Sequence, residues 1–122
     1  MKVSELNPPE LDYWVAKIEY PKSKVTLEDG IVFLDRHDST GINDTVVRYG
    51  GIKCNYSEKW RHGGPLIEKY NVFVGPHGDG VWGASRKGEH GSYDGYGPTP
   101  LIASMRCIVS SVYGENVDIS NE

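Results

Sequence analysis

Cysteine is scarce in this 122-residue chain, which contains only Cys54 and Cys107. Two cysteines are too few for the disulfide scaffold of a small secreted protein. Cys54 stands in a polar stretch and Cys107 in an apolar helical pattern, so we expect two unrelated reduced thiols. The chain also lacks an apolar run of the roughly 20 residues that span a bilayer, and its first residues lack the apolar core of a signal peptide. We therefore expect a cytoplasmic protein with no membrane contact.

A surplus of positive charge is also missing, because 17 Asp and Glu outnumber 13 Lys and Arg, for a net charge of −4. This balance argues against a protein that wraps duplex nucleic acid or an anionic membrane. The length fits one domain, and we expect residues 1–122 to form it. Glycine is abundant instead, with eight glycines among residues 75–97, so we expect a Gly-rich loop region there.

Two segments, one near each end of the chain, have the pattern of amphipathic helices. Asn7 and Pro8 are typical first residues of a helix, which Pro21 ends near residue 20. Thr99–Pro100 begins the second helix, and Gly114 ends it. Apolar residues recur with the helical period in both, and we expect the following to be buried: Leu11, Trp14, Val15 and Ile18, then Leu101, Ile102, Met105, Ile108, Val109 and Val112.

Extended segments lie between and after the helices. Asp29–Gly30 predicts a hairpin turn, and residues 76–79 predict a second one. The segment 67–74 alternates, with Tyr70, Val72 and Val74 on one face. The fold class that follows is α+β, an antiparallel sheet of about four to six short strands packed with an N-terminal and a C-terminal helix. The expected strands are residues 24–27, 31–34, 45–49, 67–74, 80–85 and 117–119.

Patterns for catalysis and metal binding are weak. Residues 78–83 match G-x-G-x-x-G, but the polar, glycine-interrupted sequence after them does not predict the helix that a dinucleotide site requires. The four histidines are 25, 15 and 13 residues apart, unlike the short spacings of metal sites. No nucleophile-elbow motif is present. We expect no catalytic residue, no metal and no cofactor.

Three blocks of sequence carry a resemblance to a known family. They are LDYWVAK at 11–17, then Tyr56–Ser57, Trp60, GGP at 63–65 and Ile67–Glu68, and finally GPTPLIASMR at 97–106. Together they resemble the NinX-like family of small phage and prophage proteins, a family of unknown function. The resemblance spans essentially the whole chain, although residues 20–51 and 75–96 match less well. It implies a phage or prophage protein expressed in the cytoplasm of the bacterial host, and it carries no activity, substrate or catalytic residue with it.

The first hypothesis for function is a non-enzymatic accessory protein that binds an unidentified phage or host protein through an aromatic surface. Tyr, Trp and Arg are the residue types that dominate protein interfaces. If Trp60 is exposed, the segment around it is the default binding surface. The candidate binding residues are Tyr56, Trp60, Arg61, His62, Trp82 and Tyr96.

Two alternatives remain open, and the oligomeric state is open as well. A small ligand-binding domain or enzyme with a cleft beside the Gly-rich loop predicts that two or more side chains converge in a pocket. The side chains that could converge are Arg61, His62, His77, Asp79 and Asp94. Single-stranded nucleic-acid binding is the weaker alternative, because basic and aromatic residues adjoin at 59–62 and 82–87 while the net charge opposes it.

Overall fold

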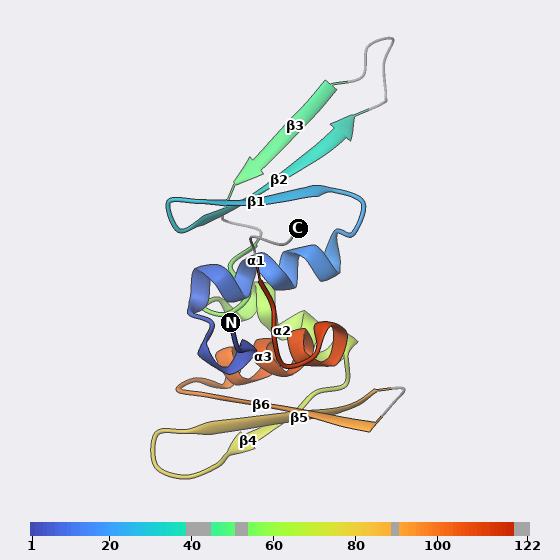
Figure 1. Cartoon of the computed structure of the whole chain (residues 1–122). Coiled ribbons are helices and arrows are strands. Elements are labelled where there is room, and N and C mark those ends of the chain that lie inside the picture. Colours follow the sequence, from blue (N-terminus) through green and yellow to red (C-terminus); the bar gives the residue numbers. More distant parts are fainter. Residues whose placement is uncertain (39–44, 51–53, 89–90, 119–122) are drawn as a thin grey trace.

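Two antiparallel sheets lie on opposite sides of a helical layer in the computed structural model, which describes residues 1–38, 45–50, 54–88 and 91–118 (Figure 1). The α+β class is confirmed, but the described strands form two three-stranded sheets rather than one. The elements are η1 (Val3–Glu5), α1 (Pro8–Glu19), β1 (Lys24–Glu28), β2 (Ile31–Asp38), β3 (Thr45–Gly50), α2 (Trp60–Lys69), β4 (Phe73–Pro76), β5 (Trp82–Gly88), β6 (Gly91–Gly97) and α3 (Pro100–Tyr113).

Helices α1 and α3 begin and end where the sequence predicts. Thr99 Oγ1 accepts a hydrogen bond of 3.1 Å from the backbone N–H of Ile102, which caps α3. Asn7 precedes α1 in an extended conformation, although its side chain makes no capping bond. The predicted burial of Val112 is wrong, because burial along α3 stops at Val109 and Val112 is 49% exposed.

The first sheet has the order β1-β2-β3 and covers α1. The predicted hairpin turn is confirmed: Glu28 pairs with Ile31, and Asp29 and Gly30 between them have φ of 51° and 75°. Two successive positive φ values are the mark of a type I′ turn. Val32 is buried, whereas β3 and the far end of β2 extend beyond the helices (Figure 1).

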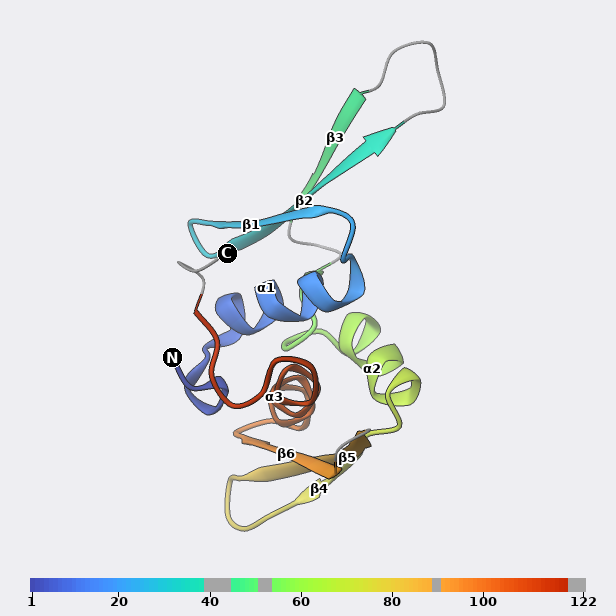
Figure 2. The same ribbon diagram turned by 45° about the vertical axis from the view of Figure 1, so that its right-hand side comes forward.

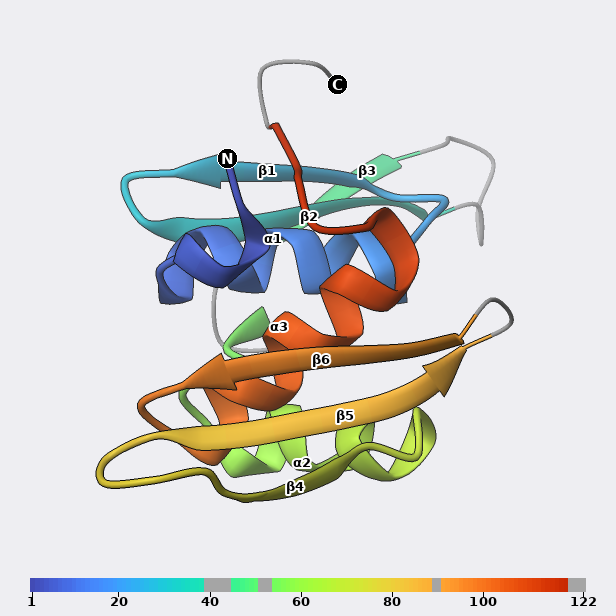
Figure 3. The same cartoon turned by 60° about the horizontal axis from the view of Figure 1, so that its bottom comes forward.

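The second sheet, β4-β5-β6, overturns the expected loop at residues 75–97, whereas the hairpin predicted at residues 76–79 and the strand predicted after it are confirmed as β4 and β5. Strands occupy most of this segment, and α3 packs along one face of the sheet (Figure 3). A Cβ built at Gly95 would lie less than 3.0 Å from the Ala103 carbonyl oxygen and the Cys107 amide nitrogen. Gly95, and Gly97 beside Ile102, therefore reflect the close approach of strand and helix rather than a loose segment.

Helix α2 replaces the first part of the strand predicted at 67–74. It lies beside α3 (Figure 2) and contains Gly63, Gly64 and Pro65, residues that disfavour a helix. A Cβ at Gly63 would approach the Tyr56 carbonyl oxygen, and would lie 2.9 Å from Leu101 Cδ2. Tertiary packing against α3 thus outweighs the weak local propensity.

The main core lies between α1, α3, α2 and the first sheet, and a smaller cluster of Ala84, Ala103 and Cys107 joins α3 to the second sheet. Both cysteines are buried and free. Residues 1–3 run beside residues 115–117, with a bridge between Lys2 and Asn116. The strand expected at 117–119 ends outside the described residues. None of the helices in the described ranges is long and apolar enough to cross a membrane.

Candidate functional site

The six candidate binding residues fall on different parts of the surface and core. Tyr56, Arg61 and His62 line one shallow depression, together with Glu19, Tyr20 and Leu66. Tyr96 lies in a second depression, on the outer face of the β4-β5-β6 sheet. Trp60 is prominently exposed, and Trp82 is half-buried. The structure therefore offers two candidate surfaces rather than one.

Trp60 meets the condition that the binding hypothesis sets. It is the first residue of α2 and is 56% exposed. One side of its ring lies over Gly64, one turn later, where a Cβ would be 3.6 Å from Trp60 Cε3. Tyr56, by contrast, is 5% exposed and belongs to the core, so little of it is available to a partner.

Positive charge gathers at the start of α2. Lys59 precedes the helix and Arg61 follows in its first turn, which contains no acidic residue, although the exposed Glu58 stands directly before Lys59. Burial, together with the nearby Arg61 and Lys59, lowers the pKa of His62, so its imidazole is neutral near pH 7. Its Nδ1 atom is buried with no hydrogen-bond partner among the described residues.

The acidic residue of the same depression is already engaged. Glu19 accepts hydrogen bonds from Lys69 Nζ at 2.9 Å and from the Tyr70 hydroxyl at 2.8 Å. These bonds tie the end of α1 to the end of α2. Lys59 and Arg61 outnumber the exposed Glu58 beside them, so the local charge is positive on the Trp60 surface, the name we give to Lys59, Trp60, Arg61 and His62.

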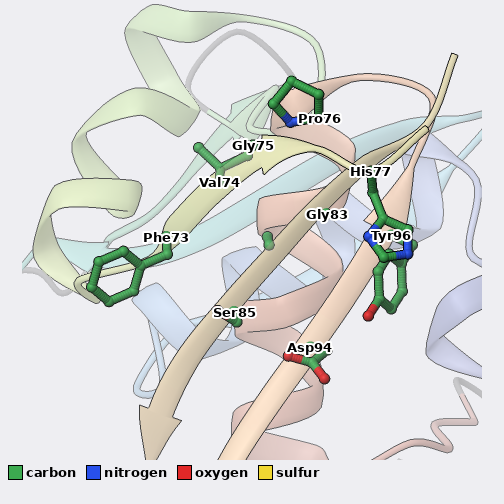
Figure 4. A pocket seen from close by; sticks show the side chains of 10 residues that line it. Phe73, Val74, Gly75, Pro76, His77, Gly83, Ser85, Asp94 and Tyr96 are labelled. Atoms are coloured by element: carbon green, nitrogen blue, oxygen red, sulfur yellow. The ribbon is translucent and has the colours of Figure 1, made fainter. Parts of the chain in front are cut away.

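The second depression is open and shallow, with a volume of about 390 Å³. Phe73 on β4 is 76% exposed, and Tyr96 on β6 is 44% exposed. The ring of His77 lies 4.7 Å from that of Tyr96, centroid to centroid. Gly75 and Gly83 line the space between these aromatic residues (Figure 4).

The ligand-binding alternative predicts convergence of at least two polar side chains, and His77 and Asp94 line this second depression. Arg61 and His62 line the first one, and Asp79 is in neither. Within the described ranges there is no group of three or more His, Cys, Asp or Glu that could hold a metal ion.

Trp82 and Phe73 show how strand alternation separates the two faces of the second sheet. Trp82 pairs with Gly97 and packs toward Ala84 on the side of α3. Phe73 points away from the core and was not among the candidate binding residues. The predicted alternation contained a signal for it, because a residue between Val72 and Val74 lies on the opposite face.

A buried carboxyl group lies in the core near the Trp60 surface. Asp12 is 6% exposed, and its Oδ1 accepts a 2.8 Å hydrogen bond from the backbone N–H of Ser57. Burial raises the pKa of Asp12 to about 7 despite this bond, and Glu58 nearby adds to the rise. The bond holds the segment before α2 against α1.

Comparison with known protein families places the chain in one of them. A family sequence model described as "Bacteriophage P22, NinX" matches residues 2–111. The matched range includes every described helix and strand except the last two residues of α3. No curated protein matches the chain.

Proposed function

The chain belongs to the bacteriophage P22 NinX family of phage accessory proteins, and from this premise we propose that it is a non-enzymatic binding protein. It acts in the cytoplasm of the bacterial host and binds a phage or host protein through the Trp60 surface. The observation that carries the proposal is the 56% exposure of Trp60.

An exposed tryptophan forgoes a large part of the stabilisation that its burial would give. Full burial of a large apolar side chain contributes about 1.5–3 kcal/mol. Helix α2 is anchored instead by Gly63 and Leu66, its buried residues. Since the fold gains little stability from the ring at position 60, a partner that covers the ring explains a tryptophan at this position better than packing within the fold does.

The neighbours of Trp60 suit a protein partner. Tryptophan and arginine are the residue types most enriched at the centres of protein interfaces, and Arg61 adjoins Trp60 directly. Lys59 and Arg61, together with the N-terminal end of α2, favour an acidic partner surface.

Affinity capture with a tagged chain from phage-producing host cells tests the proposal. We expect one protein to be retained by the wild type and by Val112→Ala, which alters another exposed apolar residue. Trp60→Ala should retain at least about thirtyfold less, as expected for an interface tryptophan. Circular dichroism should show equal folding of all three chains. Equal capture by Trp60→Ala and the wild type would refute the proposal.

A further inference from the structure

The outer face of the β4-β5-β6 sheet carries two aligned rows of residues. Helix α3 covers the opposite face, where Ala84 and Gly95 are buried. Residues on the outer face follow from strand register and alternation. One row is Phe73, Ser85 and Asp94, and the next is Gly75, Gly83 and Tyr96.

The side chains in the middle of this face are small. Gly75, Gly83 and Ser85 occupy the floor, so no large side chain fills the space between Phe73 and Tyr96. The larger side chains stand on the two outer strands, with Phe73 on β4 and Tyr96 on β6 (Figure 4). This face therefore suits a slender polar group better than a helix or a second sheet.

A carboxylate and an aromatic ring stand side by side on β6. Asp94 and Tyr96 are two residues apart on one face, a spacing of about 7 Å along a strand, and both line the depression. Across the ranges that the structure describes, no hydrogen-bond or ion-pair partner of the Asp94 carboxylate is found. Lys87 stands further along β5, beside Ser92 and outside the depression.

We propose that this face binds an arginine side chain of a partner polypeptide, with the guanidinium stacked on Tyr96 and paired with the Asp94 carboxylate. Guanidinium is planar, stacks on aromatic rings and forms paired hydrogen bonds with carboxylates. The net charge of −4 favours a basic partner segment over a phosphate-bearing one. This site is separate from the Trp60 surface and does not depend on it.

Model peptides test the site directly. A short glycine peptide with one central arginine is titrated into the ¹⁵N-labelled chain, beside the same peptide with citrulline or lysine. Citrulline keeps the shape of arginine and removes its charge. We expect amide shifts confined to β4, β5 and β6, with millimolar binding of the arginine peptide. Lysine should bind more weakly and citrulline at least about tenfold more weakly.

Matched variants separate the local carboxylate from overall charge. Asp94→Asn and Glu68→Gln each remove one negative charge, but Glu68 lies on α2, outside the depression. We expect Asp94→Asn to weaken the arginine peptide about tenfold and Glu68→Gln to leave its affinity within about twofold. Tyr96→Leu should weaken it about fivefold by removing the aromatic face.

Several results would overturn the assignment. These are no amide shifts at tens of millimolar peptide, shifts that centre outside the second sheet, and equal binding of the citrulline or lysine peptide. If Asp94→Asn and Glu68→Gln weakened binding of the arginine peptide equally, the binding would depend on overall charge and not on the Asp94 carboxylate. Trp60→Ala leaves this face intact, so that variant should lose capture of the partner protein and still bind the arginine peptide. The two proposals can therefore fail separately.

Discussion

Replacement of Gly95 by alanine tests the close approach between β6 and α3. The new Cβ would lie less than 3.0 Å from the Ala103 carbonyl oxygen and the Cys107 amide nitrogen, and 3.0 Å from Cys107 Cα. All three are backbone atoms, so no side-chain rotation can relieve the overlap. The strand and helix must move apart, and the small cluster of Ala84, Ala103 and Cys107 must loosen with them.

The expected cost follows from overpacking. Insertion of a methyl group into a well-packed core typically lowers the free energy of unfolding by about 1–3 kcal/mol. Because the atoms around the new methyl group belong to the backbone and cannot rotate away, we expect Gly95→Ala to cost about 3 kcal/mol. Gly75→Ala is the matched control on the same sheet, since nothing lies within 4 Å of its Cβ position. That change should be neutral or stabilise by up to about 1 kcal/mol, because alanine restricts the unfolded chain.

Urea unfolding followed by tryptophan fluorescence measures both changes. With a slope of about 1.5 kcal/mol/M, a loss of 3 kcal/mol lowers the midpoint by about 2 M. Gly97→Ala should fall between the two, since its Cβ would meet a side-chain atom, Ile102 Cγ2, at 2.7 Å and its nearest backbone atom, Ala103 N, only at 3.2 Å. A loss below about 1 kcal/mol for Gly95→Ala, or an equal loss for Gly75→Ala, would refute the packing argument.

Three further predictions concern the caps and buried groups. The raised pKa of Asp12, about 7 against 3.8 unfolded, means that the folded state binds the proton more tightly. The free energy of unfolding should therefore fall by about 2–4 kcal/mol between pH 4 and pH 7, and urea titrations of Asp12→Asn should lack that slope. Thr99→Ala removes the hydrogen bond from the Ile102 N–H and should lower the free energy of unfolding by about 1 kcal/mol. The melting temperature should fall by about 3–5 °C, and an unchanged melting temperature would show that the cap is dispensable. Burial raises the pKa of Cys107 to about 11, and burial also raises the pKa of Cys54 above its usual range. Ellman's reagent at pH 8 should therefore label neither thiol until urea unfolds the chain, and immediate labelling would contradict their burial.

Local signals predicted the parts of the fold that depend on local chemistry. Pro8 and Thr99 marked the starts of α1 and α3, and Asp29–Gly30 marked the first hairpin. Each of these features acts within a few residues of itself. The sequence was therefore sufficient to place them.

The features that the sequence did not predict depend on distant contacts. Gly63 and Gly95 looked like loop residues, yet each makes room for a backbone or side chain that is remote in sequence. Helix α2 and strand β6 followed from those contacts, which no local pattern contains, whereas the hairpin of β4 and β5 was predicted from its turn. The same holds for the site, since only the pairing of β4 with β5 and of β5 with β6 brings Phe73 and Asp94 onto one face.

The layered order of the fold has a geometric consequence. The first sheet packs on α1, α1 packs on α3, and α3 packs on the second sheet. At about 10 Å for each step between layers, the two sheets are about 30 Å apart. Molecules held on their outer faces would sit on opposite sides of the protein, too far apart to collide or compete. The helical layer therefore separates the outer faces of the two sheets.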